Sequence, residues 1–199
     1  MDFKDIVKNR RAIRQYESKP VPEEIIRELL EITSYAVSAI NLQPWKIKVV
    51  SDQETKDKLF PATFGQNQVK ACSHLFVFCA DTDYAGIIKA TDKIMAAGGI
   101  PDPMREAMME LAGNVANGMS PEERLAWSKE QVYIALGNCL NGAYSLGLGA
   151  CPMTAFQPPE FAKILGLPEN LVPTVMVSIG YPAEPGMPKV RRSVDEILA

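Results

Sequence analysis

The segment WSKEQVYIALGNCLNGAYSLGLGACPMTAF, residues 127–156, is the longest stretch of the chain that combines helical spacing with apolar side chains on most sides. A helix that is apolar nearly all round is typical of a protein core or of a subunit interface. The segment therefore predicts a long central helix around which the other elements pack. Its two apolar sides are formed by Val132, Leu136, Cys139, Leu140 and Ala143, and by Tyr133, Ile134, Ala135 and Tyr144.

Four glycines in this segment indicate close packing and then the end of the helix. Gly137 and Gly142 lie inside the predicted helix, where each costs about 1 kcal/mol relative to alanine, so we expect another backbone to approach closely there. Gly147 and Gly149 are predicted to end the helix by adopting left-handed backbone conformations. Residues 150–153 then indicate a short buried strand that opens into a loop at Thr154, an arrangement that can seat a flat ligand.

The composition is that of an ordinary globular protein. The chain has 199 residues, of which 47% are hydrophobic and 23% charged, with a net charge of −3. This length and composition fit one domain. The negative charge, without a run of Lys and Arg, argues against nucleic-acid binding. No stretch has the length of a membrane span or the apolar core of a signal peptide, so we expect a cytosolic protein that does not bind membranes.

The cysteines and the only histidine do not form a recognisable metal or catalytic site. None of the four cysteines is in C-x-x-C spacing, and we interpret them as buried small residues in a reducing compartment. One histidine with scattered cysteines argues against zinc. His74 begins an apolar run and no G-x-S-x-G motif accompanies it, so we expect a structural hydrogen-bonding role. The cysteines are Cys72, Cys79, Cys139 and Cys151.

The remaining pattern alternates helices with a few strands. Strands are predicted near residues 45–50, 74–80, 149–152 and 174–180, and an early helix is predicted to start at Pro22 and to end near Ser38. Two further helices, near 85–97 and 103–115, belong to a Met-rich excursion that can form an adaptable binding surface or a loosely packed surface layer. The order predicts an α+β or mixed α/β fold with a sheet of four or five strands.

Two basic clusters stand near the two ends of the chain. Like charges side by side repel unless an anion lies between them, although an isolated cluster is usually a solvated surface. If the ends meet, the clusters would form one anion site. The fingerprint G-x-G-x-x-G and the Walker motif are both missing, and no acid/base pair or nucleophile is evident, so an enzyme with these residues would need a cofactor. The clusters are Arg10, Arg11 and Arg14, and Lys189, Arg191 and Arg192.

Four motifs, in this order, resemble those of the FMN-dependent nitroreductase family, most closely its oxygen-insensitive nitroreductase/flavin reductase branch. RRAIRQY (10–16) resembles the element that binds the FMN phosphate and ribityl chain, and SAINLQPW (38–45) a segment whose Asn lies at the flavin. Residues 127–156 are similar to the family's central helix and following strand, and PKVRRSVDEIL (188–198) to the element that closes on the phosphate. The resemblance covers nearly the whole chain.

The resemblance implies a three-layer α-β-α fold with a mostly antiparallel sheet and a homodimer whose interface contains the central helix and two FMN sites. It implies one domain over residues 1–199, with the excursion at about 84–120 as a mobile cover that shapes substrate choice. It also implies ping-pong kinetics, in which NAD(P)H reduces the flavin and a nitroaromatic, a quinone or another flat acceptor reoxidises it. No side chain is then catalytic, because the flavin N5 performs the chemistry.

The resemblance also assigns residues to the FMN site. It places Asn41 at the flavin, Gln68 (or Gln66) at the polar edge of the ring, and Lys189 with Arg191 (or Arg192) at the phosphate. The remaining assigned contacts are Arg10, Arg11, Ala12 and Arg14 near the phosphate and ribityl chain, and Met153, Thr154 and Ala155 beside N5 and the ring face.

The chain departs from the family pattern at three places, each of which bears on flavin potential and co-substrate preference. Ala12 replaces a serine, residues 37–39 read V-S-A instead of P-S-S, and Thr154-Ala155 replaces Glu-Gly of the nearest branch. Two alternatives stay open from the sequence. One keeps the fold and FMN with a different reaction, such as dehalogenation or flavin cleavage, and the other is a non-catalytic flavin-binding dimer.

Overall fold

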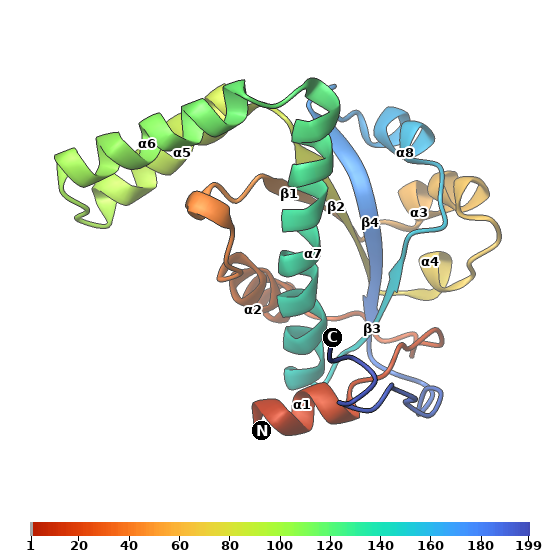
Figure 1. The fold of residues 1–199 in the computed structure, drawn as a ribbon. Helices are drawn as coiled ribbons and strands as arrows, with labels where there is room; N and C mark the ends of the chain where they lie inside the picture. The colour runs from red at the N-terminus through yellow and green to blue at the C-terminus, as the bar shows by residue number, and fades with distance from the viewer. Residues whose placement is uncertain (1) are drawn as a thin grey trace.

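The computed structural model describes residues 2–199 and contains a four-stranded sheet with helices on both faces (Figure 1). The strands follow the order β1-β2-β4-β3, and every neighbouring pair is antiparallel. The α+β prediction is confirmed, and the mixed α/β alternative is wrong because no pair in this sheet is parallel. The strands are β1 (Trp45–Val50), β2 (His74–Asp81), β3 (Gly149–Met153) and β4 (Leu171–Gly180).

The helices form one layer on each face of the sheet. Helices α2 and α7 cover one face, and α3, α4 and α8 cover the other (Figure 1). Helix α1 lies below the C-terminal end of α7. The bounds are α1 (Phe3–Asn9), α2 (Glu23–Ser34), α3 (Gln53–Leu59), α4 (Gln68–Ala71), α5 (Tyr84–Ala97), α6 (Asp102–Asn117), α7 (Pro121–Ser145) and α8 (Pro158–Leu165), with short 3₁₀ turns at Ala39–Asn41 and Phe60–Thr63.

Strand β2 shows why two apolar layers form. All eight of its residues are buried, and successive side chains of a strand point to opposite faces. Phe76 and Phe78 accordingly join the core under α2 and α7, whereas Leu75 and Val77 join the core under α3, α4 and α8. The continuous apolar run in the sequence therefore corresponds to a strand covered on both faces.

Helix α7 is the long central helix that the sequence predicts. It begins with a capping box, in which the Ser120 hydroxyl accepts from the Glu123 amide and the Glu123 carboxylate accepts from the Ser120 amide. One side is buried against the sheet and α2. The other side leaves Tyr133 47% exposed and Ile134 39% exposed in the single chain, so these apolar residues have no covering layer here.

The four glycines of this region serve different purposes. A Cβ at Gly142 would lie 2.8 Å from Ile32 Cγ2, so side chains of α2, and not a backbone as predicted, approach it closely. Apart from its chain neighbours and the backbone of α7 itself, no atom of residues 2–199 lies within 4 Å of a Cβ placed on Gly137. Gly147 ends the helix with φ +74° as predicted, but Gly149 is an ordinary strand residue and the prediction for it is wrong. A Cβ there would lie 2.9 Å from the Ile13 side chain, which explains the glycine.

Helix α2 ends at Ser34, earlier than the predicted end near Ser38, and Pro22 is its N-cap instead of its first helical residue. The hydroxyl of Thr33 donates to the Leu29 carbonyl and that of Ser34 donates to the Glu31 carbonyl. Such local side-chain bonds compete with continuation of the helix, which the apolar spacing alone did not indicate.

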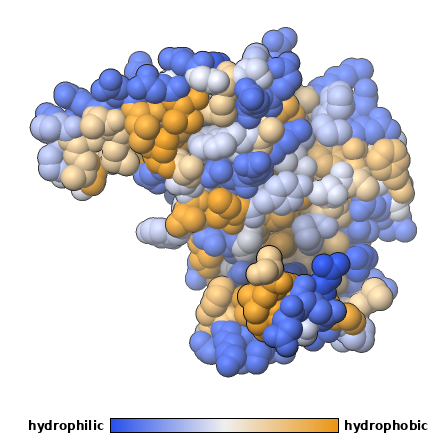
Figure 2. Space-filling model, viewed as in Figure 1, coloured by the Kyte–Doolittle hydropathy of each residue, from blue (hydrophilic) through white to orange (hydrophobic). Residues whose placement is uncertain are grey.

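Helices α5 and α6 form an arm that projects away from the rest of the chain (Figure 1). Arg105 of α6 links the two helices through an ion pair to Asp92 of α5, and it forms a second ion pair with Asp102 of its own helix. Figure 2 shows hydrophobic side chains gathered on this arm, and its exposed large apolar residues are Ile94, Met104 and Leu111.

None of the helices between Asp2 and Ala199 combines the length and the apolarity that crossing a bilayer requires.

Candidate functional site

The two ends of the chain meet beside the edge strand β3. The segment after α1 pairs with β3 through a bridge between Ala12 and Ala150, and it pairs with the segment after β4 through a bridge between Tyr16 and Pro182. The Tyr16 hydroxyl donates a hydrogen bond, and it lies 2.7 Å from the Ile13 carbonyl oxygen and 2.8 Å from Ser178 Oγ. The basic residues near the two ends of the sequence are therefore neighbours in space.

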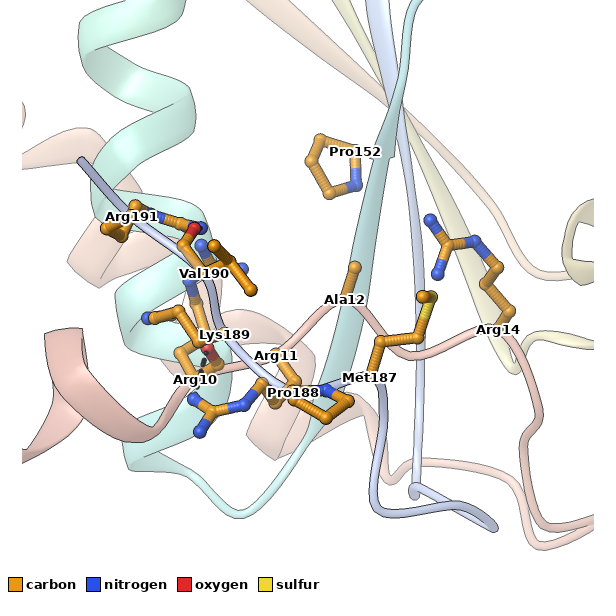
Figure 3. Close-up of a pocket in the computed structure, with 10 residues that line it drawn as sticks. All are labelled: Arg10, Arg11, Ala12, Arg14, Pro152, Met187, Pro188, Lys189, Val190 and Arg191. Carbon is orange, nitrogen blue, oxygen red and sulfur yellow. Dashed lines mark hydrogen bonds between the residues drawn. The ribbon is translucent and has the colours of Figure 1, made fainter.

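Between these two segments lies an open pocket of about 370 Å³. In Figure 3, Arg10, Lys189 and Arg191 gather on one side of it and Arg14 stands on the other, with Pro152 of β3 between them. Five of the predicted phosphate-end residues and Ala12 thus share one pocket, and Arg192 is not among its lining residues. The lining residues are Arg10, Arg11, Ala12, Arg14, Pro152, Met187, Pro188, Lys189, Val190 and Arg191.

The charges in this pocket are of one sign. Burial and the neighbouring Arg191 and Arg11 lower the pKa of Arg10. Burial together with Arg10, Arg191 and Arg11 likewise lowers the pKa of Lys189. Within residues 2–199 none of the five lining cations, Arg14 included, takes part in an ion pair with a carboxylate. Bound anions relieve such repulsion, and guanidinium groups bind phosphate well.

The cations differ in the hydrogen bonds that they already make. Arg11 Nη1 lies 2.8 Å from the Lys8 carbonyl oxygen and 2.7 Å from that of Asn9, at the C-terminal end of α1. The Lys189 ammonium donates to the Val7 carbonyl at the same helix end. Cations are favourable there because the C-terminal carbonyls are unpaired. Both side chains thus fasten the end of α1 to the segments that line the pocket.

The end of β3 and the loop after it form a second part of the site. Met153 is buried, whereas Thr154 and Ala155 are exposed. The Gln66 amide donates to the Ala155 carbonyl at 2.6 Å, and the Gln68 amide lies 3.1 Å from Met153 Sδ. Gln66 and Gln68 both reach the end of β3, so both sequence alternatives lie beside Met153–Ala155.

Asn41 is the one predicted site residue that a single chain does not bring to the others. It lies in the turn before β1, and β1 and β3 are the opposite edges of the sheet, three strand spacings or about 14 Å apart. Its side chain is exposed and accepts a hydrogen bond from the side-chain amide of Gln43 at 3.1 Å.

The turn that carries Asn41 is strained. Ile40, Asn41 and Gln43 have φ values of +54°, +56° and +48°, a conformation that costs about 1–3 kcal/mol for a residue other than glycine. The turn is held by two hydrogen bonds to its backbone. The Gln43 backbone amide donates to Ser38 Oγ at 2.9 Å, and the Ala39 backbone amide donates to Gln131 Oε1 of α7 at 2.9 Å. Strained backbone that is held in this way is frequent at binding sites.

Sequence reasoning missed several residues of the site. Pro152, Met187, Pro188 and Val190 line the pocket without carrying charge, so a search for charged or polar side chains could not find them. Glu184, which accepts a hydrogen bond from the Arg14 backbone amide, was also missed, because it lies in a Pro/Gly-rich segment that shows no periodicity.

His74 lies away from this site, is 3% exposed and pairs with Ser73 and Glu23, in agreement with a structural role. All four cysteines are buried and unbonded to one another. No group of three His, Cys, Asp or Glu side chains in the described part of the chain is arranged to bind a metal ion.

Comparison with known proteins connects this architecture to one family. The model of the nitroreductase family matches residues 7–181. A Thermus thermophilus protein named NADH dehydrogenase is 38% identical over 198 residues, which span 100% of this chain and 95% of the relative. The major NAD(P)H-flavin oxidoreductase of Aliivibrio fischeri is 28% identical over 207 residues, which span 96% of this chain and 95% of the relative.

Solved structures of similar fold cover the whole chain. A family protein of Exiguobacterium sibiricum, crystallised in complex with FMN, superposes with a TM-score of 0.92 at 24% identity and covers 100% of this chain and 97% of its own. A Staphylococcus epidermidis protein described as an NAD(P)H:FMN oxidoreductase reaches 0.93 at 20% identity, with 100% and 95% covered. These similarities establish that the sheet, its flanking helices and α7 form the same fold in all three proteins.

Proposed function

Because the chain belongs to the nitroreductase family, we propose that it is an FMN-dependent oxidoreductase that takes reducing equivalents from NAD(P)H. We propose nitroaromatics, quinones or similar flat molecules as the acceptors. The single observation that carries this proposal is the pocket in which segments near both ends of the chain gather five cations, none of them paired with a carboxylate of the described residues.

The phosphate of FMN fits this pocket by charge and by donor chemistry. A phosphate monoester carries up to two negative charges, and Arg10, Arg14 and Arg191 provide planar donor groups on both sides of the pocket. Lys189 adds a point charge whose position is fixed by its bond to Val7. In this proposal, the two chain ends clamp the phosphate and so orient the rest of the cofactor toward the end of β3.

The flavin ring is proposed to lie against Met153, Thr154 and Ala155. Met153 would provide an apolar surface, and the exposed backbone that follows it would offer hydrogen-bond partners to the ring edge. Gln66, in the loop before α4, donates to the Ala155 carbonyl and so holds this backbone, and Gln68 of α4 donates to the Met153 sulfur. When bound there, FMN supplies the chemistry that the side chains lack, accepting a hydride from NAD(P)H and passing electrons on to the acceptor.

A homodimer is proposed to complete each site. Asn41 lies at the opposite edge of the sheet from the cationic pocket, and in this proposal it contacts the flavin that a second chain holds. Tyr133 and Ile134 are exposed on α7, and burying them against a second copy would stabilise the pair by the hydrophobic effect. This arrangement would give two equivalent FMN sites at the interface.

We propose that residues 1–199 form one FMN-binding domain and that residues 84–120 act as its mobile substrate cover. The arm of α5 and α6 carries exposed apolar side chains and an internal Arg105 clasp, so it can move as one piece about its base. Its methionines offer a flexible apolar surface for flat acceptors of different shape.

Steady-state kinetics test this function. The protein with added FMN is mixed with NADH or NADPH and a quinone such as menadione, and both concentrations are varied. We expect turnover that requires FMN, with the parallel double-reciprocal lines of a ping-pong mechanism. Arg10→Ala should need about ten times or more FMN for half-maximal rate, because it loses a charge-assisted contact of about 1.5–3 kcal/mol. Turnover that is independent of FMN would contradict the proposal.

A further inference from the structure

The Glu184 carboxylate is joined to the backbone that carries the pocket's arginines. Its Oε1 atom accepts hydrogen bonds from the Arg14 amide at 2.6 Å and from the Gln15 amide at 3.2 Å. Both donors are backbone groups, and they lie between the two bridges that tie this segment to β3 and to Pro182. The amides of these two residues are thus bonded by a side chain that is 170 and 169 positions away in the sequence.

The contact belongs to a continuous connection between the two chain segments that form the pocket. The Ala183 amide donates to the Gln15 carbonyl at 3.0 Å, and the Glu17 amide donates to the Tyr181 carbonyl at 2.9 Å. Two residues after Glu184, Gly186 adopts φ +70°, and a Cβ there would lie 2.7 Å from Arg11 Cβ. The chain then continues into Met187–Arg191, the other wall of the pocket.

A carboxylate beside a cationic pocket is unfavourable for anion binding if charge alone is considered. Glu184 is half-buried, it forms no ion pair with any residue from 2 to 199, and its hydrogen bonds come from the backbone of residues 14 and 15. Arg14 is thus held through its backbone, and its guanidinium stays available on the pocket side (Figure 3). The carboxylate therefore has a geometric effect that opposes its electrostatic one.

We propose that Glu184 is a positioning residue, which fixes the Arg14 segment against the Met187–Arg191 segment so that the anion pocket exists before its ligand arrives. This inference rests on the proposed function for the identity of the ligand, FMN, and on the hydrogen bonds alone for the positioning. An anchor that joins both walls lowers the cost of ordering them on binding.

Two substitutions separate geometry from charge. Glu184→Gln keeps a carbonyl oxygen that can accept from both amides but removes the negative charge, whereas Glu184→Ala removes both. We expect the FMN dissociation constant of Glu184→Ala to rise about tenfold, and that of Glu184→Gln to stay within about twofold of the parent value. Glu17→Ala is the matched control, because Glu17 is an exposed acid of the same segment with no side-chain bond in the described chain, and we expect it to leave FMN binding unchanged.

Amide hydrogen exchange provides a readout that does not depend on FMN. In the ligand-free protein, the Arg14 and Gln15 amides should exchange faster in Glu184→Ala than in the parent and in Glu184→Gln. The Ile13 amide, which donates to the Ala150 carbonyl at 3.1 Å, serves as the internal reference and should not change. If the parent protein binds no flavin, inorganic phosphate replaces FMN as the probe, and its binding is followed through the NMR chemical shifts of the same amides. Absence of flavin binding would contradict the proposed function but not this inference.

Several outcomes would overturn the positioning role. Parent-like FMN affinity in Glu184→Ala would show that the anchor is not needed, and equally tighter binding in both variants would show that Glu184 acts through its charge only. Faster exchange of the Ile13 amide together with a general loss of melting temperature in Glu184→Ala would mean that Glu184 supports the whole fold instead of the pocket.

Discussion

The five cations of the pocket are the residues on which the proposed FMN site depends most directly. Their clustering was predictable because Arg10, Arg11, Arg14, Lys189 and Arg191 are visible in the sequence as two charged motifs. The residue pattern alone left open whether the two clusters meet, and only the family resemblance placed both at one phosphate. Their meeting depends on the bridges of residues 12 and 16 and on the Glu184 contact, which leave no periodic pattern. The role of each cation in FMN binding stays a prediction.

Arg191 and Arg192 offer a matched pair, since they are adjacent and identical in charge but only Arg191 lines the pocket. We expect Arg191→Ala to weaken FMN binding by about 1.5–3 kcal/mol, the range for a hydrogen bond to a charged group. Arg192→Ala should change it by less than about 0.5 kcal/mol. Fluorescence titration of FMN measures both values. A larger loss in Arg192→Ala than in Arg191→Ala would show that the register of this segment is different.

At the scale of single elements, the sequence predicted the helices and strands best where packing is regular. The spacing of α7 and the apolar run of β2 report directly which faces are covered, so both elements were predicted near their observed positions. The early end of α2 and the strained turn at Ile40–Gln43 depend on hydrogen bonds of Thr33, Ser38 and Gln131. Those bonds cannot be read from hydrophobic periodicity.

The two interior glycines of α7 are expected to respond differently to substitution by alanine. We expect Gly142→Ala to lower the free energy of unfolding by about 1–3 kcal/mol, because the added methyl group would lie 2.8 Å from Ile32 and 3.1 Å from Leu29. Urea denaturation at fixed protein concentration measures this loss.

Gly137→Ala is the counterpart, because outside α7 itself no described residue lies near its Cβ position. The helix alone would gain about 1 kcal/mol from this change. We expect the variant to dissociate more readily into monomers. In the proposed dimer a second copy packs closely against Gly137, and the added methyl group would disturb that contact. Sedimentation equilibrium measures the dissociation constant. An unchanged dimer, or a monomeric parent protein, would contradict the interface assignment.

All four cysteines of the molecule are buried in its two apolar layers, and their burial makes the stability depend on pH. Burial raises the pKa of Cys72 to about 11 and the pKa values of Cys79 and Cys139 to about 12. In the unfolded chain the same thiols lose their protons near pH ~8.5. Above that pH the unfolded state binds fewer protons than the folded state, so the free energy of unfolding must fall as pH rises.

We expect stability to be complete below about pH 8 and to decrease between about pH 9 and 11, by up to ~1.4 kcal/mol per pH unit for each buried thiol. Burial also raises the pKa of Tyr16 and adds to the decrease. Urea denaturation at several pH values measures the slope, and Cys139→Ala should make it less steep. A stability that is constant up to pH 11 would mean that these thiols are accessible to water in the folded protein.

The proposed function requires that FMN bound to this protein takes electrons from NADH or NADPH and passes them to an acceptor. Anaerobic mixing of the FMN-loaded protein with NADH or NADPH, while the visible absorbance of the flavin is followed, tests this claim. We predict rapid loss of this absorbance with at least one of the two donors, and recovery when a nitroaromatic or a quinone is added. A protein that binds FMN but keeps its absorbance with both donors would contradict the claim.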